Sequence, residues 1–293
     1  MSVKSAPPLR VASRQEMSTN PDFTAAFASP VAAETYDEVL VPRLFTPCAK
    51  ILLERLGLRA GETLLDVACG TGIVARLAAP LLGPGGRVIG RDINEAMIAR
   101  ARSHALPRNS ASVMFGVSPA AALDLADTSV DAVTCQQGLQ FFPEPAAALS
   151  EMRRCLRPNG RAAIAVWFGI NECPLWAALE VGLAEQFGTE RAAAIRRPFS
   201  WPGPGALTAE LAGAGFDEIR LSDHTVVMPF ERGVRQAMRA LVSTPFSAEV
   251  SALDADAYER MTRAVMRHLG RTTDADDSVD IPARTLIAVA AHG

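Results

Sequence analysis

A short apolar run followed by two closely spaced glycines constrains the fold of this chain more than any other feature. Residues 63–68 are mostly apolar and contain Asp66, and the turn 69–72 (Cys-Gly-Thr-Gly) leads into a helical stretch that extends to Leu82. The glycines allow a sharp change of backbone direction and a close approach of the backbone to a ligand. The segment therefore predicts a strand, a glycine turn and a helix.

The same alternation of strand and helix continues along the chain. Further strands are predicted over 87–90, 112–116, 130–135, 161–168, 218–228 and 285–291. Helices are predicted over 94–104, 145–156, 174–197 and 205–215, with a turn over 157–160 and a helical insertion over 231–271. Between residues 23 and 58, two or three short helices are expected, with Pro42 and Pro47 as interruptions. Strands that alternate with helices through short turns indicate parallel βαβ units and a doubly wound α/β sheet.

Composition narrows the functional classes. The 293 residues carry a net charge of −3 and no basic cluster, which argues against nucleic acid as a partner. The longest apolar run, residues 162–170, is too short to cross a membrane. Residues 1–20 lack the apolar core of a secretory signal, and five widely spaced cysteines form no Cys-x-x-Cys pair. We expect a cytoplasmic protein without a metal site.

The glycine turn alone leaves two cofactor classes open. The pattern Gly-x-Gly-x-x-Ala over 70–75, with Asp92 20 residues after Gly72, fits the spacing of a dinucleotide-binding fingerprint. Asp66 favours another ligand, because a carboxylate repels a pyrophosphate and attracts an ammonium group. S-adenosylmethionine has both an ammonium group and a ribose diol, so it would give Asp66 and Asp92 each a partner. The alternative role of Asp92 is to cap the next helix, for which Asn94 is the other candidate.

Four segments together resemble a known family. They read LDVACGTG (65–72), GRDINEAM (90–97), CQQGLQFFP (135–143) and EMRRCLRPNGR (151–161). In this order they resemble the motifs of the class I S-adenosylmethionine-dependent methyltransferases, and particularly the small-molecule, type 11-like group that includes the ubiquinone/menaquinone-biosynthesis C-methyltransferases. The resemblance is close over about residues 30–168. It implies S-adenosylmethionine as cofactor and S-adenosylhomocysteine as product.

The resemblance also implies which residues contact the cofactor. Those for its methionine portion are Ala68, Gly70, Gly72 and Gln136, the last through its backbone carbonyl to the ammonium group. Those for its nucleoside are Asp92, which would hold both ribose hydroxyls, and Ile93 and Met97, which would pack on the adenine. Tyr36 resembles the family's N-terminal tyrosine that closes over the cofactor carboxylate. A buried core tyrosine is the alternative for that residue.

The sequence departs from the family after the third strand. The family usually has an acidic residue followed by alanine there, and the acid accepts a hydrogen bond from the adenine amine. This chain has Ser118 and Pro119. Serine can accept that hydrogen bond but has no charge, and proline removes a backbone donor. We expect a lower cofactor affinity, unless a backbone carbonyl near Ser118 replaces the acceptor.

The resemblance implies a Rossmann-like sheet of seven strands, mostly parallel with an antiparallel last strand, plus helical cap insertions. The expected organisation is a disordered tail (1–20), an N-terminal helical lid (21–58), a cofactor-binding Rossmann-like core (59–168), and the completion of the sheet with a helical substrate cap (169–293). The cap itself would cover about 169–204 and 229–280.

The expected reaction is an in-line transfer of a methyl group to a small organic molecule. Aromatic residues in the connecting segments favour an apolar or aromatic acceptor. We expect methylation on oxygen; a quinone-like or other metabolite methylated on carbon or nitrogen is the alternative. His224, beside Asp223, is a weak candidate for a general base, and an exposed strand histidine is its other interpretation.

An NAD(P)-dependent oxidoreductase and a noncatalytic S-adenosylmethionine-binding protein are the rival classes. A monomer or homodimer is expected, without nucleic acid or membrane partners.

Overall fold

The computed structural model describes residues 29–271 and 274–293. The predicted tail and residues 21–28 of the predicted lid lie outside these ranges. No helix of the described ranges combines the length and apolar character needed to cross a membrane.

Seven strands form one twisted sheet in the order β3-β2-β1-β4-β5-β7-β6. Their bounds are β1 Thr63–Val67, β2 Arg87–Asp92, β3 Ser112–Val117, β4 Val130–Gln136, β5 Leu156–Trp167, β6 Asp217–Phe230 and β7 Val279–Ala291. Strands β1 to β5 pair in parallel, and β7 runs antiparallel to both of its neighbours, β5 and β6. The predicted fold class is confirmed, including the antiparallel last strand.

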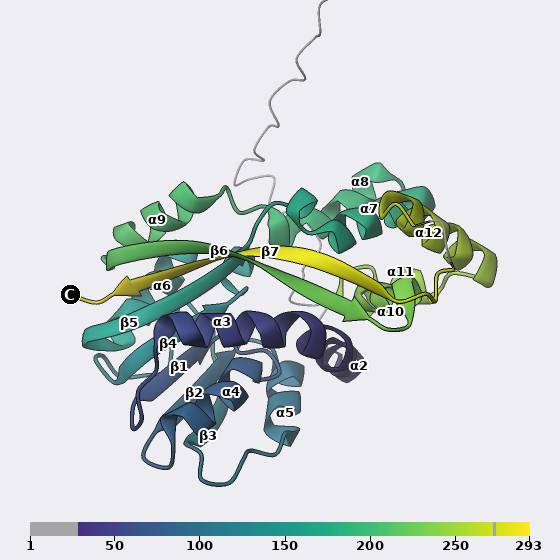
Figure 1. Ribbon diagram of the computed structural model, residues 1–293. Coiled ribbons are helices and arrows are strands. Elements are labelled where there is room, and N and C mark those ends of the chain that lie inside the picture. The colour runs from purple at the N-terminus through teal and green to yellow at the C-terminus, as the bar shows by residue number, and fades with distance from the viewer. Residues whose placement is uncertain (1–28, 272–273) are drawn as a thin grey trace, which may run out of the picture.

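Helices cover both faces of the sheet, which explains the apolar strand sequences. Leu64 and Leu65, adjacent on β1, point to opposite faces and are both fully buried. Leu64 packs with helices α3 (Thr46–Leu56) and α4 (Ile73–Leu82), and Leu65 packs with α6 (Pro145–Cys155) and α9 (Pro204–Gly213). Helix α5 (Glu95–Ser103) lies against β2 and β3. Figure 1 shows the two helical layers.

The N-terminal helical segment is continuous from Pro30 to Leu56, without the interruptions predicted at Pro42 and Pro47. Helix α2 (Pro30–Thr35) continues through a π-helical segment, η2 (Tyr36–Phe45), into α3. Pro42 lies inside η2, where the wider spacing of i to i+5 bonds accommodates a residue that would break an α-helix. Pro47 lies in the first turn of α3, where a missing N–H is tolerated. Prolines at these two places therefore do not divide the segment.

Three other predicted boundaries are wrong in detail. The predicted turn over 157–160 lies within β5, as an irregularity in its pairing with β4 at which Asn159 takes a φ of 63°. The predicted helix over 174–197 divides at Gly188 into α7 (Pro174–Phe187), α8 (Thr189–Ala192) and a 3₁₀ segment, η5 (Ala193–Phe199). Strand β7 begins six residues before the predicted Thr285, because it pairs along nearly the whole of the long strand β6.

The long ends of β6 and β7 reach a group of helices beyond the rest of the sheet (Figure 1). These helices are α7, α8, α10 (Gly233–Met238), α11 (Ser247–Ser251) and α12 (Ala255–His268), with the 3₁₀ segment η6 (Arg239–Ser243). Their apolar side chains share one buried cluster with the N-terminal helices, as the burial of Leu44, Phe246 and Met261 shows. The segments on either side of the core in the sequence are thus packed together.

Candidate functional site

The glycine turn lies where the order of strands reverses, between the carboxyl ends of β1 and β4. In open α/β sheets, this is where a crevice for ligands forms. Ala68 and Gly70 both take left-handed backbone conformations, with φ of 55° and 54°. The Gly70 N–H donates to Asp92 Oδ2 over 2.8 Å, so the loop is fixed to the end of the neighbouring strand β2.

Asp92 is held by backbone amides on both of its carboxylate oxygens. In addition to the bond from Gly70, the Asn94 N–H donates to Asp92 Oδ1 over 2.9 Å. Burial raises the pKa of Asp92, and the amide hydrogen bonds act against this shift. Asn94 caps α5, because its side-chain oxygen accepts from the N–H groups of Ala96 and Met97. Asp92 is therefore not the helix cap, and its oxygens retain lone pairs that can accept further hydrogen bonds.

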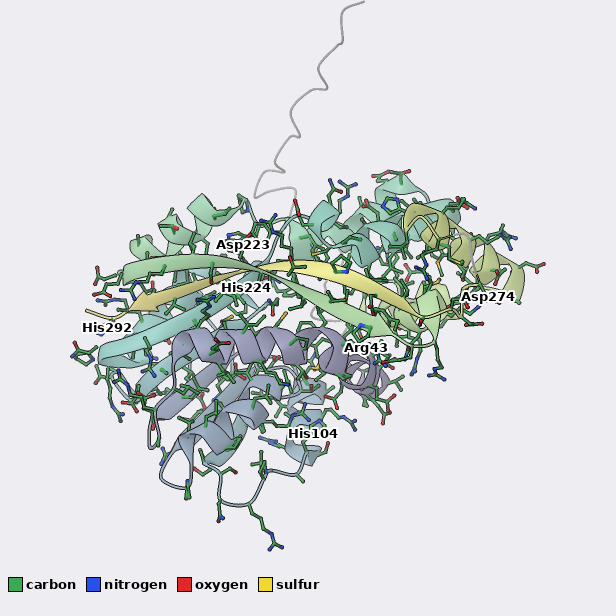
Figure 2. The ribbon with its side chains drawn as sticks, in the orientation of Figure 1. Arg43, His104, Asp223, His224, Asp274 and His292 are labelled. Carbon is green, nitrogen blue, oxygen red and sulfur yellow. The ribbon has the colours of Figure 1, made fainter. Side chains whose placement is uncertain are left out.

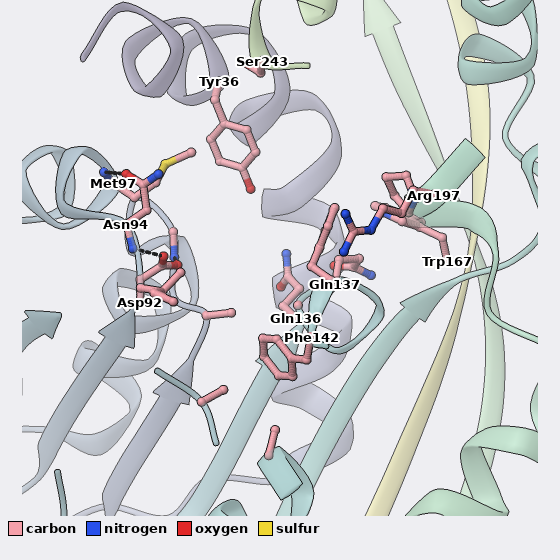
Figure 3. A pocket seen from close by; sticks show the side chains of 18 of the residues that line it. Tyr36, Asp92, Asn94, Met97, Gln136, Gln137, Phe142, Trp167, Arg197 and Ser243 are labelled. Carbon is pink, nitrogen blue, oxygen red and sulfur yellow. Dashed lines mark hydrogen bonds between the residues drawn. The ribbon is translucent and has the colours of Figure 1, made fainter. Parts of the chain in front are cut away.

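A cavity of about 620 Å³ extends from the glycine turn, a volume suited to a cofactor and a small ligand. The sequence-predicted residues that line it are Tyr36, Ala68, Gly70, Asp92, Ile93, Met97, Pro119 and Gln136. Four other predicted residues are not part of its lining: Asp66, Gly72, Ser118 and His224. The structure thus brings most of the predicted set around one space, shown in Figure 3.

Asp66 lies behind the cavity wall in the interior of the sheet. Its side chain is only 1% exposed; Oδ1 accepts from the Thr134 hydroxyl over 2.9 Å, and Oδ2 has no hydrogen-bond partner. Burial raises the pKa of Asp66 to about 7, a shift that the Thr134 bond opposes. The predicted direct attraction of a ligand ammonium group to this carboxylate has no support in its position.

The raised pKa of Asp66 predicts a specific dependence of stability on pH. In the folded state Asp66 keeps its proton up to about pH 7, whereas in the unfolded chain it releases the proton near the ordinary pKa of 3.8. The contribution of protonated Asp66 to stability is therefore complete at low pH and is lost as pH rises toward 7. Asp66→Asn removes the titration. We expect the free energy of unfolding of this variant, relative to wild type, to increase by at least about 1 kcal/mol between pH 5 and pH 6.5. Urea unfolding at a series of pH values measures it; a difference that stays constant with pH would contradict the assignment.

Gly72 and Ser118 have roles in packing. A Cβ atom on Gly72 would lie 2.7 Å from Phe115 Cζ, so this glycine gives room to a core side chain and not to a ligand. The Ser118 hydroxyl donates to the Ala122 carbonyl over 3.3 Å, and Ser118 is buried. Pro119 lines the cavity in its place. The predicted hydrogen bond from an adenine amine to the serine hydroxyl is therefore not supported by the orientation of that side chain.

His224 lies on β6, the edge strand of the sheet, away from the cavity. Its Nε2 is 3.0 Å from Ser222 Oγ, and burial lowers its pKa. Figure 2 shows His224 and Asp223 on this outer strand. All four histidines of the chain lie in the described ranges, and none lines this cavity. His224 is thus a half-buried histidine on the outer strand, and its position gives no support to a role as general base.

The N-terminal segment closes one side of the cavity. Asp37, which was not predicted from the sequence, fixes this segment to the glycine turn. The Asp37 carboxylate accepts from the Thr71 hydroxyl over 2.8 Å and from Arg100 Nε over 2.9 Å, and it lies 2.9 Å from His104 Nε2. Next to it, Tyr36 enters the cavity, and burial together with the Asp92 charge raises its pKa well above the ordinary value. Tyr36 therefore keeps its proton at neutral pH.

Aromatic rings form a continuous wall from Tyr36 into the helical region. Successive ring centroids are 4.9 Å apart for Tyr36 and Phe45, 6.2 Å for Phe45 and Trp167, 6.3 Å for Trp167 and Phe199, and 5.6 Å for Phe199 and Trp176. All five side chains line the cavity. Their contact is set by the packing of η2, β5, α7 and η5, which bring together residues from 36 to 199.

Two polar residues accompany the aromatic wall. Figure 3 shows Gln137, Trp167 and Arg197 on one side of the cavity and Asp92, Asn94 and Met97 on the other. Neither Gln137 nor Arg197 was predicted, because nothing in the local sequence distinguishes them from other polar residues. The cavity therefore has two ends: one formed by the glycine turn and Asp92, and one that is aromatic with a few polar groups.

Comparison with known proteins identifies the family. The family described as "Methyltransferase domain" matches residues 65–164. Nocamycin O-methyltransferase from Saccharothrix syringae is 33% identical over 198 residues, which cover 64% of this chain and 70% of that protein. A ubiquinone/menaquinone biosynthesis C-methyltransferase, UbiE of Hahella chejuensis, is 35% identical over 116 residues, or 39% of this chain and 47% of the relative. The match thus spans about half of that C-methyltransferase.

Solved structures show the same fold. The YcgJ protein of Bacillus subtilis has a TM-score of 0.55 at 16% identity, covering 83% of this chain and 97% of that one. Phosphoethanolamine N-methyltransferase 2 of Haemonchus contortus, in complex with S-adenosyl-L-methionine, has a TM-score of 0.58 at 17% identity, covering 92% of this chain and 59% of that one. Together with the sequence relatives and the glycine-turn cavity, these findings show that the chain belongs to the class I S-adenosylmethionine-dependent methyltransferases and uses S-adenosylmethionine as its cofactor.

Proposed function

We propose that this enzyme transfers a methyl group to an oxygen atom of an apolar or aromatic small molecule bound at the aromatic end of the cavity. The observation that carries this proposal is the continuity of the cavity, which joins the glycine turn to the wall of Phe45, Trp167 and Phe199. The similarity to nocamycin O-methyltransferase supports oxygen as the acceptor atom.

The residues at the glycine-turn end fit S-adenosylmethionine. Asp92 presents two oxygens that already accept amide bonds and can each accept a ribose hydroxyl. Ile93, Met97 and Pro119 form an apolar surface suited to the adenine. The left-handed backbone at Ala68 and Gly70 leaves the methionine portion room, since even a Cβ atom added to Gly70 would lie 3.9 Å from the Tyr36 hydroxyl, its nearest neighbour.

The chain's own contribution to the reaction is mainly orientation and exclusion of water. The bound cofactor supplies a methyl group on a sulfonium, which is already activated for displacement. Tyr36 and Asp37 hold the N-terminal segment over the glycine turn, and the helices of 169–204 and 229–280 cover the aromatic end through Trp176, Phe199 and Thr244. We assign the first segment as the lid and the other two as the substrate cap. Placement of an acceptor oxygen next to the methyl can supply much of the rate enhancement.

Product analysis tests the acceptor atom. The protein is incubated with S-adenosylmethionine that carries a ¹³C-labelled methyl group and a panel of phenols, enols, carboxylic acids and quinols, and products are detected by the mass increase and by ¹³C NMR. We expect the label at the chemical shift of a methoxy carbon. A label on carbon or nitrogen would contradict oxygen methylation. Binding of S-adenosylhomocysteine, measured separately by calorimetry, shows that the protein used is competent.

A further inference from the structure

Arg197 places a positive charge in the cavity without an acidic partner. Of the residues that line the cavity in the described ranges, it is the only basic one. Its Nε is buried without a hydrogen-bond partner, and no ion pair within 29–271 and 274–293 includes its guanidinium. The neighbouring Arg196 differs: it is exposed and pairs with Glu180 at 2.5 Å. Arg197 as a whole is half-buried, but a guanidinium with a buried N–H that has no protein acceptor favours an anion from outside.

The backbone that carries Arg197 is fixed. It lies in η5, where Ile195, Pro198 and Phe199 are buried on either side of it. Phe199 packs between Trp167 and Trp176, so the guanidinium and the flat aromatic wall keep a constant relation to each other. Figure 3 shows the side chain directed into the cavity near Gln137. A site that is fixed before binding loses little entropy when its ligand arrives.

Gln137 adds a second polar group of defined orientation. The Thr285 hydroxyl donates its proton to the Val166 carbonyl over 3.1 Å, so it can only accept from Gln137 Nε2, which lies 2.9 Å away. This leaves Gln137 Oε1 as a buried acceptor without a partner. A guanidinium N–H or a ligand hydroxyl can donate to this oxygen. Arg197 and Gln137 together can therefore bind an anionic oxygen group, Arg197 through its charge and Gln137 through a directional hydrogen bond.

The lining of the cavity offers little means to remove a proton from a neutral acceptor. It contains no histidine, Tyr36 stays protonated, and the Asp92 oxygens are held by two amides. The remaining carboxylate, Glu144, is exposed at the start of α6. An acceptor that arrives already ionised needs no base. Because S-adenosylmethionine is a sulfonium cation, an anionic acceptor also offsets its charge.

We propose that Arg197 is a specificity-determining residue that selects an organic anion, namely a carboxylate or an ionised enol attached to a flat apolar body. This inference rests on the proposed function, since it names the class of acceptor for the same site. The apolar body packs against Trp167 and Phe199, and the anionic oxygens bind the guanidinium. A carboxylate and an ionised enol share the feature that the guanidinium would recognise, a delocalised negative charge on oxygen.

Matched ligand pairs test the proposal by calorimetry on the protein saturated with S-adenosylhomocysteine. The carboxylate arm compares 2-naphthoate with 2-naphthamide and indole-3-acetate with indole-3-acetamide; the enol arm compares an ionised cyclic 1,3-diketone with its enol ether. In at least one arm, we expect the anion to bind at least about tenfold more tightly than its neutral partner. Arg197→Gln should abolish this preference, Arg197→Lys should retain part of it, and Arg196→Gln should leave it unchanged.

Several results would overturn the inference. These are equal or tighter binding of the neutral partners, binding of no member of either arm, or an anion preference that survives in Arg197→Gln. Affinity for S-adenosylhomocysteine is measured first for each protein. If wild type does not bind it, the proposed function fails; if wild type binds it but shows no anion preference, only the assignment of Arg197 fails.

Discussion

Replacement of Asp92 by alanine is expected to weaken the binding of S-adenosylhomocysteine by about 100-fold or more. The variant would lose two charge-assisted hydrogen bonds to the ribose, each of about 1.5 kcal/mol or more. It would also lose the bond that the Gly70 N–H donates to Asp92 over 2.8 Å, which fixes the conformation of the glycine turn. Calorimetric titration with S-adenosylhomocysteine measures the loss.

Two further variants separate the ribose contact from general effects. Asp92→Asn keeps the size of the side chain but offers one acceptor where the Gly70 and Asn94 amides require two, so it should also lose most of the affinity. Asp124→Ala is the matched control: it removes an exposed carboxylate that pairs with Arg91 at 2.6 Å outside the cavity. An affinity of Asp92→Ala close to that of Asp124→Ala would contradict ribose binding.

The sheet and the cofactor end could be predicted because their signals are local in sequence. The apolar run that contains Leu64 and Leu65 requires a strand buried on both faces, and the glycines that follow require a turn into a helix. Asp92 follows from a fixed spacing after that turn. All of these features lie within about 30 consecutive residues. The pairing of neighbouring strands is enough to place Asp92 beside the glycine turn.

The acceptor end could not be predicted in this way. Phe45, Trp167 and Phe199 meet only after η2, β5 and η5 have packed against one another, and aromatic residues at such positions are equally typical of an ordinary core. The role proposed for Arg197 rests on the lack of an ion pair with any carboxylate of residues 29–271 and 274–293, which is visible only in the folded chain. Asp37 likewise depends on contacts with Thr71 and Arg100, which are distant in the sequence.

The two motif glycines show the limit of an argument from motif alone. Both were expected to make room for the cofactor, but only Gly70 lines the cavity. Gly72 is required by Phe115, a β3 side chain whose contact with this turn is not evident from the sequence. The same pattern of two glycines therefore contains one position that lines the cavity and one that makes room for a core side chain.

This difference predicts that Gly72→Ala destabilises the protein much more than Gly70→Ala. Alanine at either position must adopt a left-handed backbone, with φ of 81° at residue 72 and 54° at residue 70, at a cost of about 1–2 kcal/mol. At residue 72 the new methyl group would also lie 2.7 Å from Phe115 Cζ, which adds an overpacking cost of about 1–3 kcal/mol. We expect Gly72→Ala to lower the free energy of unfolding by about 4 kcal/mol, measured by urea unfolding.

Two controls isolate the contact with Phe115. Gly205→Ala, within α9, has no atom within 4 Å of the new methyl group and no left-handed backbone, so it should leave stability unchanged or raise it by up to about 1 kcal/mol. Phe115→Leu, combined with Gly72→Ala, should recover part of the lost stability, because the shorter side chain relieves the overlap. Equal unfolding midpoints for Gly72→Ala and Gly70→Ala would show that backbone strain alone requires these glycines, and Gly72 would then lose its assignment to the core.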